Sequence, residues 1–101
     1  MSPINKKKIF DVIREQRHFI KQYGVKKLGL FGSFVKKAEQ KRSDVDILVE
    51  FNPGKKTFDN YMELKFFLEK LFHRKVDLIV RQALKPMIKD QILKEVQYAR
   101  L

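Results

Sequence analysis

Two carboxylates stand two residues apart in the run Ser43-Asp44-Val45-Asp46-Ile47-Leu48-Val49-Glu50. On a β-strand alternate side chains point to opposite faces, so Asp44 and Asp46 would share one face while the aliphatic residues enter the core. Their Cα atoms would lie roughly 7 Å apart, and their oxygens can converge on one point. Oxygen ligands suit Mg²⁺ or Mn²⁺, and a cation would also relieve the repulsion between the two charges. Viewed alone, such a pair is more often a solvated strand edge.

A third carboxylate, Asp77, interrupts the apolar run from Val76 to Val80. If its strand is a neighbour of the strand that carries Asp46, the two side chains can lie side by side. Three carboxylates on one sheet face can hold two metal ions and leave an oxygen to orient or deprotonate a hydroxyl. The alternative interpretation of Asp77 is an outward position on a half-exposed strand.

The dipeptide Gly32-Ser33 precedes the Asp pair and follows an apolar run that ends at Phe31. Glycine lets the backbone approach a ligand closely, and a serine at a helix start can offer its hydroxyl and nearby N–H groups to phosphate oxygens. An ordinary serine N-cap after a glycine turn explains the dipeptide about as well. The spacing is neither that of a Walker A loop nor that of a dinucleotide-binding fingerprint.

The hydrophobic pattern predicts the elements that would position these residues. Apolar residues at helical spacing indicate a helix over about residues 5–22, a long helix over Phe58–Phe72 and a last helix that starts at Pro86 and continues through Val96. Strands are expected at Val25–Phe31, Asp44–Phe51 and Lys75–Arg81, with a helical turn and a polar loop over residues 34–42. This order predicts an α/β (α+β) fold, a small three-stranded mixed sheet covered by helices, in a single domain over residues 1–101.

Composition excludes several classes of protein. The chain has 101 residues, with 23 Lys or Arg against 12 Asp or Glu, a net charge of +11, and no Cys, which rules out disulfides and thiolate metal sites. We find no bilayer-spanning run and no signal peptide, so we expect a cytoplasmic protein. Residues 1–42 hold twelve basic and three acidic residues, so this segment carries a net charge of +9 out of the total of +11. The charge predicts an anionic partner, and a small basic nucleic-acid binder is one interpretation that rests on it alone.

The motifs together resemble a known family. Leu30-Phe31-Gly32-Ser33, a ten-residue gap, and Asp44-Val45-Asp46 followed by an apolar strand are similar to the signature of DNA polymerase beta-like nucleotidyltransferases. More narrowly, the chain resembles the minimal nucleotidyltransferases, the antitoxins of HEPN/MNT toxin–antitoxin pairs. The resemblance covers nearly the whole chain, including Lys75-Val76-Asp77-Leu78-Ile79-Val80. Each part is weak alone, but their joint occurrence is specific.

The resemblance implies a metal-dependent adenylyltransferase. Gly32, Ser33 and Lys36 would hold the triphosphate of ATP, and Asp44, Asp46 and Asp77 would bind two Mg²⁺ ions, or Mn²⁺, with Asp77 nearest the attacking hydroxyl. AMP would pass from ATP to a hydroxyl, expected to be that of a tyrosine, on a HEPN-domain ribonuclease toxin and so neutralise it. The partners implied are this toxin and a nucleoside triphosphate, with no membrane and no specific nucleic acid.

The chain departs from the family pattern after Gly-Ser. Members usually continue with Arg-Ala-Arg-Gly, whereas this chain has Phe34-Val35-Lys36-Lys37. Lys36 keeps a positive charge without the bidentate fork of arginine, and Phe34 carries no charge. A second interpretation is therefore a catalytically weak antitoxin that binds and occludes its toxin.

Overall fold

The computed structural model describes residues 4–36 and 43–101, in which helices and strands are interspersed. The predicted polar loop beyond Lys36 lies outside the described residues, as does Lys37. The helices are α1 (Lys6–Glu15), α2 (Arg17–Gln22), α3 (Phe58–Phe72) and α4 (Pro86–Glu95), with short 3-10 turns η1 (Gly32–Phe34) and η2 (Arg81–Ala83). The strands are β1 (Val25–Phe31), β2 (Val45–Phe51), β3 (Val76–Val80) and β4 (Gln97–Tyr98).

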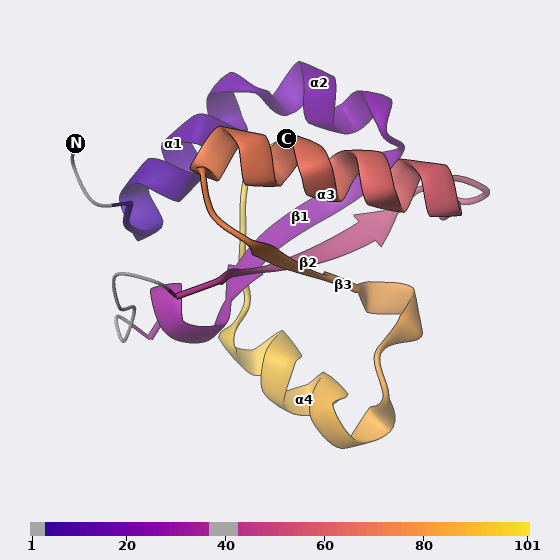
Figure 1. The fold of residues 1–101 in the computed structure, drawn as a ribbon. Coiled ribbons are helices and arrows are strands. Elements are labelled where there is room, and N and C mark those ends of the chain that lie inside the picture. The colour runs from indigo at the N-terminus through magenta and orange to yellow at the C-terminus, as the bar shows by residue number, and fades with distance from the viewer. Residues whose placement is uncertain (1–3, 37–42) are drawn as a thin grey trace.

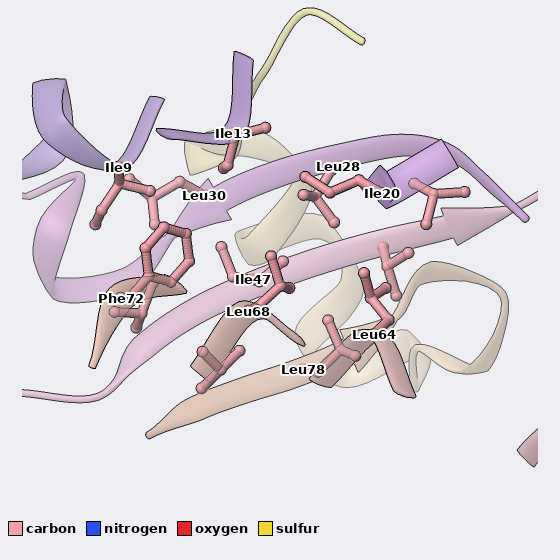
Figure 2. Packing of buried hydrophobic residues seen from close by; sticks show 14 of the residues in the cluster. Ile9, Ile13, Ile20, Leu28, Leu30, Ile47, Leu64, Leu68, Phe72 and Leu78 are labelled. Carbon is pink, nitrogen blue, oxygen red and sulfur yellow. The ribbon is translucent and has the colours of Figure 1, made fainter. Parts of the chain in front are cut away.

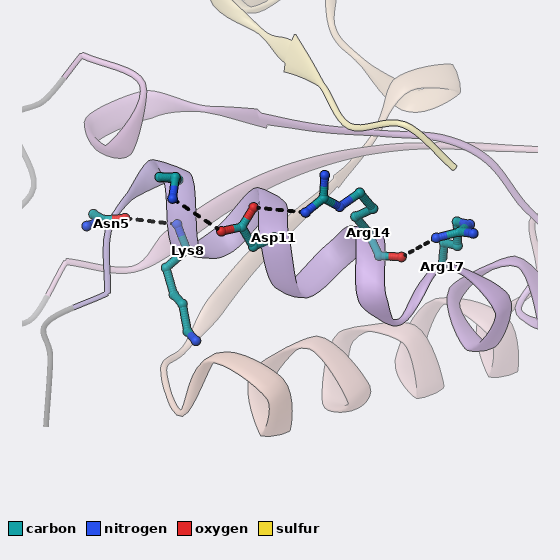
Figure 3. A network of polar contacts seen from close by, with 6 residues as sticks. Asn5, Lys8, Asp11, Arg14 and Arg17 are labelled. Carbon is teal, nitrogen blue, oxygen red and sulfur yellow. Dashed lines mark hydrogen bonds and ion pairs between the residues drawn. The ribbon is translucent and has the colours of Figure 1, made fainter.

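The first helix is shorter than the sequence predicts, because the chain turns at Gln16 and continues as α2. Asn5 caps α1 by accepting a hydrogen bond from the Lys8 N–H at 2.9 Å. Gln16, with ψ of 13°, ends α1 and begins α2. The Arg17 guanidinium donates to the Arg14 carbonyl at 2.9 Å and so satisfies a backbone group near this break (Figure 3). Side-chain periodicity alone could not reveal it, since apolar spacing continues across the turn.

The sheet is mixed and has the strand order β3-β2-β1-β4. Strand β2 is antiparallel to β1 and parallel to β3, while β1 is antiparallel to β4. The α/β fold class is therefore confirmed, but the sheet has four strands where the sequence predicts three. The fourth was missed because it has only two residues, too few for a detectable alternation. The last helix ends at Glu95, one residue before the predicted end, and Val96 is extended.

Helices cover the two faces of the sheet unequally. Helices α1, α2 and α3 lie on one face and α4 lies on the other (Figure 1). Residues from the three helices and the inward positions of the strands form the hydrophobic core (Figure 2), whose fully buried members include Ile9, Ile13, Ile20, Leu28, Leu30, Val45, Ile47, Val49, Leu64 and Leu68. Helix α4 has no buried residue. In the described part of the chain, no helix is long and apolar enough to cross a membrane.

Side chains of α3 hold the outer edge of β3. The Glu69 carboxylate accepts a hydrogen bond from the Val76 N–H at 2.9 Å, and the Tyr61 hydroxyl donates to the Leu78 carbonyl at 2.7 Å. These bonds satisfy backbone groups that would otherwise be available to another strand. They also fix the strand segment that carries Asp77.

Replacing Tyr61 with Phe should lower the free energy of unfolding by about 1 kcal/mol, because the Leu78 carbonyl loses its partner in a partly buried position. Urea denaturation of both proteins measures the difference. Tyr98→Phe is the matched control, since this residue is 43% exposed and its change should lie within about 0.5 kcal/mol. Equal effects of the two substitutions would show that the Tyr61 hydroxyl does not support the edge of β3.

Candidate active site

Sheet register brings two of the three predicted carboxylates together. Asp46 of β2 is the direct partner of Asp77 in the parallel β2–β3 pair, and it is also opposite Phe31 in the β1–β2 pair. Paired residues of neighbouring strands point to the same face, and this face is the one opposite Val45 and the core. The condition under which the sequence places Asp77 beside Asp46, that their strands are neighbours, is therefore met.

Asp44 lies beside this pair but outside the strand. It immediately precedes β2 and is exposed, as is Asp77, whereas Asp46 is half-buried. Within residues 4–36 and 43–101, no three Asp, Glu or His side chains converge closely enough to hold a metal ion. The arrangement therefore brings the carboxylates to one end of the sheet without forming a finished triad, and their role as ligands remains a prediction.

Electrostatics at Asp46 indicate a place for a cation. Burial, followed by the charges of Asp77 and Asp44, raises the pKa of Asp46 from 3.8 to about 6. A hydrogen bond from the Ser33 N–H opposes this increase in pKa, and the charge of Glu95 adds to it. An oxygen-only donor set whose charges repel one another fits Mg²⁺ or Mn²⁺, because a divalent cation would favour the ionised form of each carboxylate. The donor chemistry thus fits the metal that the family resemblance implies.

The Gly32-Ser33 turn packs directly against Asp46. Gly32 has φ of +75°, and a Cβ placed on it would overlap Asp46 Oδ2 and lie 2.9 Å from Asp46 Cγ. The backbone of Gly32 therefore closely approaches Asp46, where the sequence predicts a close approach to a ligand. Asp46 also accepts a hydrogen bond from the Ser33 N–H. The alternative interpretation of Ser33 as an N-cap is wrong, since η1 begins at Gly32 and is preceded by Phe31 without a side-chain cap.

Phe34 and Lys36, which stand where the family pattern has arginine, have different environments. Phe34 is fully buried, and the Arg74 guanidinium lies over its ring, 5.5 Å from the centroid. Arg74 also donates to the Ser43 carbonyl at 2.9 Å, next to Asp44. An aromatic residue at position 34 thus anchors the turn to the chain that leads into β2. Lys36 remains at the surface, with its side chain 55% exposed.

Glu95 is a site residue that the sequence interpretation missed. Its carboxylate accepts a hydrogen bond from the Gly32 N–H at 3.1 Å and pairs with Lys36 Nζ at 3.2 Å. It lies 63 residues from Gly32 and has the sequence context of an ordinary exposed helix end. Only the path of α4 beneath the sheet brings it to the turn, so no local signal could have identified it.

Comparisons with known proteins bear on the family and the fold of the chain. The nucleotidyltransferase domain family matches residues 13–99. The protein adenylyltransferase MntA of Thermococcus cleftensis is 39% identical over 77 residues, which are 76% of this chain and 77% of that protein. A solved structure assigned to a minimal nucleotidyltransferase matches with a TM-score of 0.74 at 27% identity, over 96% of this chain and 98% of that one.

A second solved structure adds a fold similarity at lower identity. It is a Shewanella oneidensis complex of tri-AMPylated HEPN toxin with MNT antitoxin. The match has a TM-score of 0.63 at 16% identity and covers 88% of this chain and 70% of the other. At that identity the similarity concerns the fold alone, and it agrees with the arrangement of sheet and helices described above.

Proposed function

Because the chain belongs to the nucleotidyltransferase domain family, we propose that it is an antitoxin-type protein adenylyltransferase that transfers AMP from ATP to a hydroxyl of a HEPN ribonuclease toxin. The acceptor is the hydroxyl of a tyrosine, and the modification neutralises the toxin. A single domain over residues 1–101 carries the activity, in the cytoplasm. The names of the similar proteins support this proposal, since one is a protein adenylyltransferase and another is an MNT antitoxin bound to a tri-AMPylated HEPN toxin.

The observation that carries the proposal is the register pair of Asp46 and Asp77 beside the Gly32-Ser33 turn. The turn, whose polar groups can bind phosphate, thereby lies beside the carboxylates, which can bind a metal, at one end of the sheet. An acceptor can approach from solvent, because Asp77 and Asp44 are exposed. This openness fits an acceptor carried by a second protein.

Each predicted residue has a chemical role in this proposal. Gly32, Ser33 and Lys36 hold the triphosphate: Gly32 shapes the turn, and the Ser33 hydroxyl and the Lys36 ammonium group bind phosphate oxygens. Asp44, Asp46 and Asp77 would hold two Mg²⁺ ions, or Mn²⁺ ions in their place. When bound, the metal neutralises charge that develops on the phosphate oxygens.

The reaction is an in-line displacement at the α-phosphorus. The acceptor oxygen forms a bond to this phosphorus while the bond to the bridging oxygen between the α- and β-phosphates breaks, and pyrophosphate leaves. The hydroxyl proton passes to a carboxylate oxygen of Asp77, the exposed member of the register pair. Ser33 and Lys36 keep the triphosphate oriented for this attack.

Transfer to the toxin tests the proposal directly. Purified chain, Mg²⁺, ATP labelled on the α-phosphate and the proposed HEPN toxin should yield labelled toxin, whereas ATP labelled on the γ-phosphate should leave the toxin unlabelled. Chelation of the metal with EDTA and replacement of the acceptor tyrosine by Phe should each abolish the signal. Absence of labelled toxin with the wild-type protein contradicts adenylylation.

Neutralisation by binding and occlusion is the second candidate. It is favoured by the lack of a converged ligand triad among the described residues and by the existing ion pair between Lys36 and Glu95. A variant that cannot label the toxin distinguishes the two mechanisms. If the Asp44→Ala, Asp46→Ala double variant protects cells from the toxin as well as wild type does, occlusion is the mechanism.

A further inference from the structure

One carboxylate joins two groups of the predicted phosphate site. Glu95 Oε1 accepts from the Gly32 N–H at 3.1 Å, and Glu95 Oε2 pairs with Lys36 Nζ at 3.2 Å. The Lys36 N–H in turn donates to the Gly32 carbonyl at 3.1 Å. Backbone and side-chain bonds therefore close a ring through Gly32, Lys36 and Glu95, so that the carboxylate fixes the ammonium relative to the turn.

Glu95 is itself held in place by the sheet. It is the last residue of α4, and the next residue, Val96, packs so closely on β1 that a Cβ at Gly29 would lie 2.5 Å from Val96 Cγ2. Strand β4 then pairs with β1 through Gly29 and Leu30. The Glu95 side chain is only 20% exposed. Although the rest of α4 buries no residue, its end is anchored against β1, so Glu95 is a fixed point of attachment for the flexible Lys36 side chain.

The contacts leave room for a phosphate ligand. A lysine ammonium has three N–H donors, and the ion pair with Glu95 needs one, so two remain for phosphate oxygens. The Gly32 and Ser33 N–H groups are occupied by Glu95 and Asp46, which makes them supports of the turn. A triphosphate can therefore bind at Lys36 while Glu95 stays in place. Holding the long side chain in advance reduces the entropy lost on binding.

We propose that Glu95 is a positioning residue of the nucleotide site, whose carboxylate holds Gly32 and Lys36 in the arrangement that receives the triphosphate. The proposal rests on the proposed function, because it takes a nucleoside triphosphate as the ligand. Glu95 acts through the two groups it binds and does not contact the reacting atoms.

Nucleotide binding to the full chain tests this role. The dissociation constant of a non-hydrolysable ATP analogue, measured calorimetrically with Mg²⁺, should rise about tenfold in Glu95→Ala, the equivalent of one charge-assisted hydrogen bond. Glu95→Gln keeps an acceptor for the Gly32 N–H and should fall between wild type and Glu95→Ala. Asp90→Ala removes an exposed carboxylate from the same helix and should leave binding unchanged. Circular dichroism establishes that each variant is folded, and Glu95→Gln serves if Glu95→Ala is not.

Coupling to Lys36 separates positioning from a general structural effect. Lys36→Ala should weaken binding strongly in wild type and much less in Glu95→Ala, because the unheld ammonium already contributes little. At saturating ATP, toxin labelling by Glu95→Ala should stay within about threefold of wild type, since the residue affects nucleotide binding and not the chemical step.

Several results would overturn the proposal. Unchanged affinity in Glu95→Ala, or additive effects with Lys36→Ala, would leave Glu95 a purely structural residue, and tighter binding would make it a competitor of the phosphate. The two proposals fail separately. If the wild-type protein binds the analogue but does not label the toxin, only the proposed adenylyltransferase function is contradicted. If the wild-type protein labels the toxin and Glu95→Ala binds the analogue normally, only the proposed role of Glu95 is contradicted. If the wild-type protein cannot bind the analogue, both proposals are contradicted.

Discussion

Replacing Asp46 with Asn is expected to abolish AMP transfer and, at the same time, to make the folded protein more stable at neutral pH. Asn keeps the shape of the side chain and an oxygen that can accept the Ser33 N–H, but it removes the charge that Asp77 and Asp44 repel. Activity is lost because the predicted ligand loses its anionic oxygen. Stability rises because a half-buried charge among like charges is removed.

The pH dependence follows from the raised pKa of Asp46. In the unfolded chain this carboxyl titrates near 3.8, and in the folded protein near 6. Below the unfolded value both states are protonated and the folded state carries no penalty. Stability is then lost as pH rises toward and through the folded value, because the unfolded chain releases its proton more easily. Above pH 6 the full penalty applies, and with an allowance for solvent screening it is about 1–2 kcal/mol.

Urea denaturation of wild type and Asp46→Asn in EDTA measures this penalty. The variant should be more stable than wild type at pH 7.5 by about 1–2 kcal/mol and nearly equal to it at pH 3.5. Asp90→Asn, a substitution of an exposed carboxylate on α4, should show no such pH dependence. Labelling of the toxin by Asp46→Asn should fall to background. A variant that is less stable at both pH values, or that still labels the toxin, would contradict this account of Asp46.

The sequence predicted those parts of the fold and site that depend on local patterns. Alternation along β2 correctly put Val45, Ile47 and Val49 in the core, and thereby placed Asp46 on the opposite face. The neighbouring position of Asp77 followed once the two strands were assumed to pair. The face on which each carboxylate lies could be predicted because alternation is repeated over several residues of one strand, whereas the pairing of the two strands had to be assumed.

The remaining features depend on contacts between distant segments. The turn at Gln16 interrupts a helix without interrupting its apolar spacing, and the two residues of β4 are too short for any pattern. Glu95 reaches Gly32 only because α4 passes under the sheet and ends beside β1. The Ser33 N–H was assigned to phosphate, whereas it is directed at Asp46, a preference that only the packed turn reveals.

Gly32→Ala should disrupt the site more severely than an alanine substitution at any other described glycine with positive φ. Two effects combine at this position. The φ of +75° disfavours any L side chain by about 1–2 kcal/mol. The added Cβ would also overlap Asp46 Oδ2, so either the carboxylate or the turn must move. We expect the free energy of unfolding to fall by about 3 kcal/mol. Toxin labelling should fall by about a hundredfold or more, because the groups proposed to bind phosphate and the carboxylate are displaced together.

Gly54→Ala separates the two effects. Gly54 has φ of +79°, nearly that of Gly32, but a Cβ there would have no atom within 4 Å. Its substitution should therefore show only the backbone penalty, about 1–2 kcal/mol in urea denaturation, with normal labelling. In the Asp46→Ala background the overlapping carboxylate is absent, so the stability loss caused by Gly32→Ala should shrink to nearly that of Gly54→Ala. If the loss stays the same in that background, backbone strain alone explains it, and glycine is not required at position 32 for the close approach of Asp46.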